Sequence, residues 1–151
     1  MKYGATLLVV KDMEISKKFY QDVLGLDVVE DFGANVTLSG GISLQTLESW
    51  KEFIGKDVSF GGNDGELYFV EDDLDAFLRQ LQGKSVRLIH PLKTHAWGQR
   101  VVRFSDPDGH LIEVGEPLSA VAKRFQTEGM DEPTIAKRMD VPLSLVVSLL
   151  K

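Results

Sequence analysis

The hydrophobic positions of the first third of the chain alternate between the period of a strand and that of a helix. An apolar run over 5–10 predicts a first strand. Apolar residues at helical spacing then predict a helix over 12–24, which ends at Gly25. Turn residues and short apolar runs predict three further strands, over 26–29, 35–38 and 42–47. This part of the chain therefore has the order β-α-β-β-β.

The same order is predicted again further along. A strand at 66–70 and a helix at 73–82 precede three strands at 86–89, 99–104 and 111–114. Val9 and Asp12 correspond to Val70 and Asp73 at one constant offset, and the run 41–45 resembles 109–113. Two unrelated β-α segments could look alike by chance, but a duplication is the favoured interpretation.

The predicted fold class is therefore α+β. Duplicated βαβββ modules over 1–48 and 64–117, joined by a connector over 49–63, are expected to form a curved eight-stranded sheet around a cup. A short amphipathic helix is expected within the connector. A helical C-terminal tail over 118–151 follows the domain of residues 1–117.

The tail predicts three helices, and the last two resemble a helix-turn-helix pattern. The final segment, 143–150, offers only leucine, valine and serine. A helix that reads DNA needs side chains that bond to bases and phosphates. We therefore expect hydrophobic docking of this segment, on this chain or on a partner, and no nucleic-acid binding.

Composition removes several classes of function. The 151 residues include no cysteine, which excludes disulfides and thiolate chemistry. The net charge of −6 is dispersed, with no basic cluster for nucleic acid. No apolar run reaches the ~18 residues of a membrane span, and the run 5–10 is too short for a signal peptide. We expect a cytoplasmic protein without a membrane partner.

Candidate chemistry lies in the last predicted hairpin. The turn Asp106-Pro107-Asp108-Gly109 suits a proline-preset bend with a glycine at positive φ. Arg103 lies between Val102 and Phe104, and Glu113 lies between Ile112 and Val114. If the four apolar residues pack under helices, Arg103 and Glu113 must point to the opposite, concave face. We expect the ligand there.

Three sequence motifs resemble the vicinal-oxygen-chelate superfamily, which includes glyoxalase I, bleomycin-resistance proteins and extradiol dioxygenases. They are D-P-D-G-x-x-x-E at 106–113, V-x-D-hydrophobic at 10–13 and S-x-x-F-Y at 16–20. The resemblance covers about the first four-fifths of the chain. It implies the duplicated βαβββ fold, a ligand site in the cup and a homodimer, for which the apolar segment 143–150 is a further argument.

The resemblance also implies four metal-ligand positions, at Ala5, Gln45, Glu66 and Glu113. Alanine has no donor atom, and Glu66 stands where members of the superfamily carry imidazole. Zinc, nickel and iron sites depend on nitrogen ligands. The three oxygen ligands left could hold Mg²⁺ or Mn²⁺. We expect no cofactor, with such a hard cation as the open alternative. Glu113 could instead simply pair with Arg103.

Two functions remain open. The favoured one is binding of a small molecule in the cup without a complete transition-metal site, as in metal-free bleomycin-resistance proteins. The alternative is a metal-dependent lyase or isomerase of glyoxalase or epimerase type, in which Glu113 or Glu66 takes a proton beside a carbonyl. We expect a lid loop over 90–98 and an exposed His110. The expected ligand contacts are Arg103, Tyr68, Trp97, His95, Trp50 and Phe53.

Overall fold

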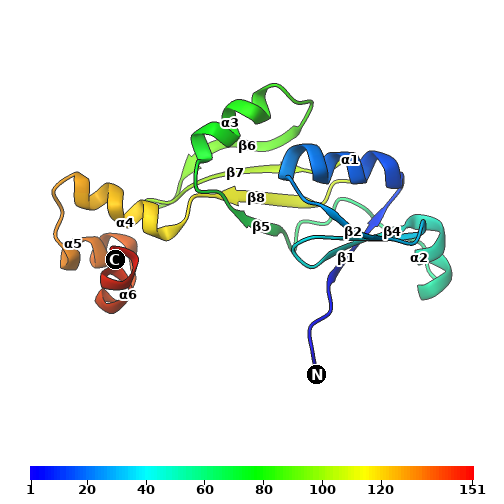
Figure 1. Cartoon of the computed structure of the whole chain (residues 1–151), viewed down its shortest axis with the longest axis horizontal. Helices are drawn as coiled ribbons and strands as arrows, with labels where there is room; N and C mark the ends of the chain where they lie inside the picture. The colour runs from blue at the N-terminus through cyan, green and yellow to red at the C-terminus, as the bar shows by residue number, and fades with distance from the viewer. The chain divides into compact units, whose positions relative to one another are not determined.

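The computed structural model describes residues 1–151, which divide into two compact units (Figure 1). The first unit comprises residues 1–65 and 105–111. The second unit comprises residues 66–104 and 112–151. The turn at 105–111 thus belongs to the first unit, although most of the hairpin it closes belongs to the second.

The first unit holds a four-stranded sheet in the order β1-β4-β3-β2, with β1 parallel to β4. Helix α1 covers one face of this sheet (Figure 1). Tyr20, Val36 and Leu44 are fully buried in this unit. The elements are β1 (Thr6–Val10), α1 (Met13–Leu24), β2 (Val28–Asp31), β3 (Asn35–Leu38), β4 (Ile42–Thr46) and α2 (Leu47–Ile54).

The second unit repeats this arrangement. Its sheet has the order β5-β8-β7-β6, and β5 is parallel to β8 as β1 is to β4. Asp12 and Asp73 cap α1 and α3 in the same way, each accepting a hydrogen bond from the backbone three residues on. The elements are β5 (Leu67–Val70), α3 (Leu74–Gln82), β6 (Arg87–Thr94), β7 (Arg100–Ser105) and β8 (Leu111–Gly115).

The α+β class and the duplication are therefore confirmed, with the eight strands divided between two four-stranded sheets. Two predicted strands differ from the observed ones by two residues or more at one end or both. Strand β2 begins two residues late because Gly25, at φ 66°, and Leu26 bond back to the last turn of α1. Strand β6 runs on to Thr94, so His90 lies in a strand and not in a loop. Pro91 is tolerated there because β6 is an edge strand.

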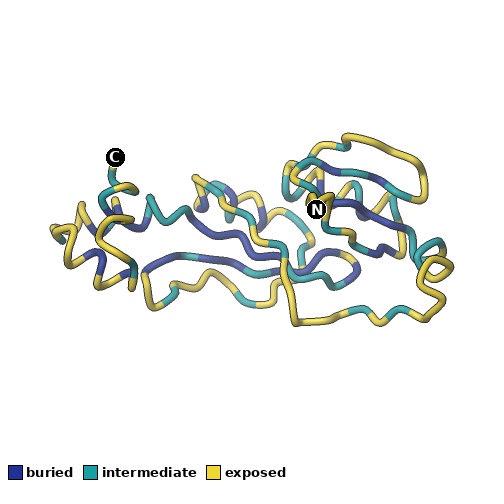
Figure 2. Tube along the Cα trace, turned by 90° about the horizontal axis from the view of Figure 1, so that it is seen from below, coloured by how far each residue is buried: buried dark blue, intermediate teal, exposed yellow.

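The alternation in the closing hairpin orients its two faces as predicted. Val102, Phe104, Ile112 and Val114 are all buried. The ring centroids of Phe104 and of Phe77 on α3 lie 6.2 Å apart, so the four buried residues face this helix. Strands β7 and β8 are buried along almost their whole length, dark blue in Figure 2.

The C-terminal segment forms three helices around a small core. Val121, Phe125, Ile135 and Val146 are buried in it, and Leu149 and Leu150 pack against it. The apolar segment 143–150 is thus only partly covered within the chain, because Leu143 and Leu145 stay 46% and 37% exposed. The helices are α4 (Leu118–Thr127), α5 (Glu132–Met139) and α6 (Leu143–Leu149). None of the helices is long and apolar enough to span a membrane.

The buried carboxylate of Asp106 joins two of the sequence motifs. It accepts hydrogen bonds from the Tyr20 hydroxyl at 2.9 Å and from the backbone amides of Asp108 and His110. His110 Nδ1 lies 2.7 Å from it, so the expectation of an exposed His110 was wrong. Asp108 in turn accepts from the backbone N–H of Lys11. The turn is therefore fastened to the β1–α1 corner of the first unit.

Burial alone would raise the pKa of Asp106, but hydrogen bonds from His110 and Tyr20 and the local amides outweigh it, and the net shift is downward. The folded state therefore prefers the ionised carboxylate. Its contribution to stability is complete above the ordinary pKa of 3.8 and is lost as the pH falls through the lowered folded value.

We predict that Asp106→Asn lowers the free energy of unfolding by about 2–4 kcal/mol at pH 7, because it disrupts a buried charged network. Urea denaturation of the variant and of Asp64→Asn, an exposed loop control, measures this. The difference from wild type should shrink as the pH falls below 3.8. Equal stability of the two variants at pH 7 would contradict the assignment.

Candidate functional site

The geometry of the closing hairpin places Arg103 directly across from Glu113. Backbone hydrogen bonds join Asp106 to His110 at the turn and Glu116 to Arg100 at the open end. Counting inward from both ends, residue 103 on β7 lies opposite residue 113 on β8. Both side chains leave the sheet on the side away from α3, which we call the Arg103 face.

Arg103 is the centre of an ion cluster on this face. Its Nε donates to Glu66 Oε2 at 2.8 Å and its Nη2 to Glu66 Oε1 at 3.3 Å, a bidentate pair. Its Nη2 also forms an ion pair with Glu113 Oε2. His90 Nε2 lies 3.3 Å from Nη1. The structure thus brings together Arg103, Glu66 and Glu113, three residues predicted from the sequence.

The two carboxylates of the cluster differ in their surroundings. The Glu113 side chain is 7% exposed, whereas that of Glu66 is 32% exposed. Burial raises the pKa of Glu113 above its ordinary value, and although Arg103 opposes this, the net shift is upward. Both Glu66 oxygens are engaged by Arg103. Glu113 is therefore the carboxylate better suited to hold a proton.

An aromatic and amide network continues along the same face. Tyr68 is the register partner of Glu113 on the neighbouring parallel strand, so both point to one side. Its hydroxyl accepts a hydrogen bond from Gln99 Nε2 at 2.9 Å. Gln99 Oε1 accepts from the indole of Trp97 at 3.1 Å. Trp97 stacks on His95 with 4.2 Å between ring centroids.

Tyr68 has room to lie along the sheet because Gly115 carries no side chain. A Cβ atom on Gly115 would come within 3.3 Å of the Tyr68 ring and 3.1 Å of Val101. The Tyr68 and Trp97 residues stay 50% and 38% exposed. Charged and aromatic groups are therefore both accessible on the Arg103 face, as a ligand site requires.

The donor set does not fit the transition metal that the superfamily resemblance implies. Ala5 offers no donor and precedes β1. Gln45, in the first unit, is buried and uses both amide atoms, accepting from Asn35 and donating to Ser49. Glu66 and Glu113, in the second unit, are both paired with the same guanidinium. No three histidine, aspartate or glutamate side chains converge where they could hold a metal ion.

Trp50 and Phe53 belong to the other unit. Both lie on α2 in the first unit, which confirms the predicted connector helix, and Phe53 is 68% exposed. Their role as ligand contacts stays a prediction.

Sequence reasoning missed two members of the Arg103 face, His90 and Gln99. His90 was assigned to a loop because Pro91 follows it. Gln99 could have been found, since it shares the alternating phase of Val101 and Arg103.

A cavity of about 490 Å³ lies elsewhere in the second unit, between α3 and β6. Its lining is mostly apolar and includes none of the residues predicted to bind or react. Charged and hydrogen-bonding groups that orient a ligand lie on the other face of the sheet, so we take the Arg103 face as the candidate site. The cavity is lined by Leu78, Leu81, Gln82, Lys84, Val86, Leu88, Pro91, Leu92 and Val102.

Residues 3–119 match the model of a glyoxalase-like domain. The uncharacterized protein YraH of Bacillus subtilis is 30% identical over 128 residues, covering 78% of this chain and all of YraH. A crystal structure of a protein of unknown function from Agrobacterium tumefaciens is 42% identical, with a TM-score of 0.71 over 78% of this chain and 94% of that chain.

A structure from Sphaerobacter thermophilus described as a member of the glyoxalase/bleomycin resistance protein/dioxygenase superfamily is 25% identical. It has a TM-score of 0.59 and covers 78% of this chain and 98% of its own. The duplicated βαβββ units and the hydrogen bond between Tyr20 and Asp106, which connects two of the sequence motifs, agree with these matches. The matches show that the chain belongs to the glyoxalase-like family of that superfamily.

Proposed function

We propose that this protein binds a small organic molecule on the Arg103 face. The Arg103 guanidinium there takes the place of a metal ion between the carboxylates of Glu66 and Glu113. The observation that carries the proposal is the pairing of Arg103 with both Glu66 and Glu113. Two carboxylates that close together repel each other unless a cation neutralises them. Arginine does this with fixed bidentate geometry and no need of coordination waters.

The charge of the cluster favours a particular ligand class. The cluster carries a charge of −1 when both carboxylates are ionised and of zero when Glu113 is protonated, so in neither state does a net positive charge attract a ligand carboxylate. A cationic or hydrogen-bond-donating group would be attracted to the carboxylates. Tyr68 and Trp97 offer exposed ring surface for an aromatic or apolar part. We therefore propose a basic or neutral aromatic molecule as the ligand.

A homodimer and a site completed by Trp50 and Phe53 remain part of the proposal. Phe53 is largely exposed in the first unit and is available for such a contact. The support for a second copy comes from the family resemblance.

A second candidate function is proton transfer next to a carbonyl group, favoured by the buried Glu113 with its raised pKa. Its carboxylate would take the proton, and the Arg103 guanidinium would stabilise the enolate oxygen that forms. Glu66 is less suited to the role because Arg103 engages both its oxygens.

A thermal-shift screen with size-matched aromatic amines, neutral aromatics and aromatic carboxylates tests the binding proposal. Amines or neutral molecules should stabilise the protein, by about 2.7 kcal/mol at a concentration of 100 times Kd. Glu66→Gln should reduce the stabilisation by amines, because it removes one of the carboxylates that attract them, while Glu128→Gln, at the exposed end of α4, should not. Stabilisation by carboxylates alone would contradict the proposed ligand class.

Deuterium uptake from D₂O into carbonyl compounds with an acidic neighbouring C–H tests the second candidate. Glu113→Gln should lower any uptake by about 100-fold or more, because it removes the base, yet leave binding intact. Glu128→Gln, on the exposed end of α4, is the matched control. Equal loss of binding and stability in Glu113→Gln would show that Glu113 only supports Arg103.

A further inference from the structure

The C-terminal helices hold the loop that carries His95 and Trp97. Arg124 on α4 donates from Nη2 to the carbonyl oxygen of Gly98 at 2.6 Å. Arg138 on α5 donates from Nη1 to the carbonyl oxygen of Ala96. Two guanidinium groups from different helices thus bind carbonyl groups on either side of Trp97. We call residues 95–99 the Trp97 loop.

The loop backbone also rests directly on the tail core. Gly98 has φ +94°, and a Cβ atom there would lie 2.3 Å from Cζ of Phe125. Phe125 is 6% exposed and belongs to the buried cluster of α4–α6. Arg124 and Arg138 lie over its ring, with guanidinium carbons 5.8 and 5.6 Å from the centroid. Only a residue without a side chain permits this approach.

Arg124 is itself held by a buried carboxylate. Glu116, whose side chain is 3% exposed, accepts from Arg124 Nη1 at 2.9 Å and Nη2 at 2.8 Å. It also accepts from the backbone N–H and Nε of Arg100, the first residue of β7. Burial acts to raise the pKa of Glu116, but Arg124 and Arg100 outweigh it and the net shift is downward. The Arg124–Glu116 ion pair is therefore charged and attached to the first residue of β7.

The same contacts lead into the Arg103 face. Gln99 Nε2 donates to the Glu116 carbonyl oxygen at 2.8 Å as well as to Tyr68. Its Oε1 accepts from the Trp97 indole. A connected set of hydrogen bonds thus runs from the tail, through Gln99, to the two aromatic residues proposed to meet the ligand.

We infer that α4 and α5 form a brace that fixes Trp97 on the Arg103 face, with Arg124, Arg138 and Phe125 as its positioning residues. The family match ends at residue 119, so the brace is built almost entirely from sequence beyond the shared domain. Ligand selection would then depend on a segment outside the matched domain. This last step rests on the proposed function, whereas the fixing of Trp97 does not.

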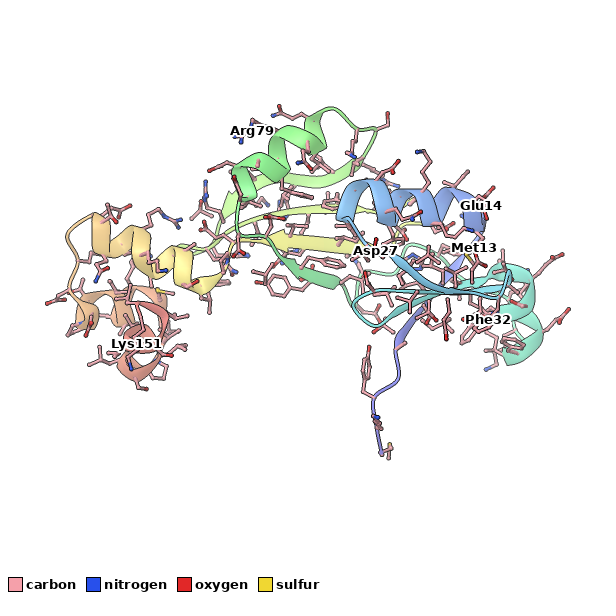
Figure 3. All side chains as sticks on the ribbon, in the orientation of Figure 1. Met13, Glu14, Asp27, Phe32, Arg79 and Lys151 are labelled. Carbon is pink, nitrogen blue, oxygen red and sulfur yellow. The ribbon has the colours of Figure 1, made fainter.

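Tryptophan fluorescence without any ligand tests the brace. In a Trp50→Phe background Trp97 is the sole tryptophan, since the chain has two. Arg124→Gln and Arg138→Gln should each raise the acrylamide quenching constant of Trp97 by about twofold or more and lower its anisotropy, because the loop gains mobility. Arg79→Gln is the control, since its side chain points away from the sheet (Figure 3).

Unchanged quenching and anisotropy in both variants would overturn the inference. Circular dichroism establishes that each variant is folded, and if Arg124→Gln is not, the exposed Arg138 decides the outcome. The thermal-shift screen repeated on Arg138→Gln tests the ligand step separately. If Trp97 becomes mobile in Arg138→Gln but ligand binding is unaltered, the brace is supported and its role in ligand selection is overturned.

Discussion

The buried carboxylate of Asp106 is the constraint on which the candidate site depends. Tyr20 from α1, His110 and two backbone amides of the turn all bind it. The turn therefore has one conformation, and the turn fixes the register of the hairpin that it closes. A slip of one residue would move Arg103 and Glu113 to the face covered by α3. Two motifs distant in sequence occur together because they meet at this carboxylate.

The site that this register creates has its charge arranged around a guanidinium. A metal ion would have to displace Arg103 from Glu66, Glu113 and His90, all of which contact this guanidinium. The two glutamates sit at positions where the superfamily resemblance implies metal ligands, with Glu66 in the place of an imidazole, and in this chain both pair with Arg103. Arg103 holds the two carboxylates differently, because it makes two hydrogen bonds to Glu66 and an ion pair with the less exposed Glu113.

The periodicity of apolar residues predicted the helices and strands, because these elements depend on residues close together in the sequence. Alternation separated the core-facing Phe104 and Ile112 from Arg103 and Glu113, and the repeat predicted the β-α-β-β-β order of elements along the chain in both units. The same patterns placed the end of β6 too early, because Pro91 ends most strands but is tolerated in an edge strand such as β6. They also gave no sign that Arg124 binds Gly98, because that contact spans 26 residues and depends on how helices pack. The spacing of apolar residues, with a period of two in strands and 3.6 in helices, carries no information about such long-range contacts.

The central claim is that Arg103, and not a metal ion, neutralises the acidic pair. Elemental analysis of the protein as purified, followed by calorimetric titration with zinc, measures this most directly. The account predicts no stoichiometric zinc, nickel or iron and no saturable zinc binding in wild type. One equivalent of metal that is bound by the wild type and lost in both Glu66→Gln and Glu113→Gln would contradict it.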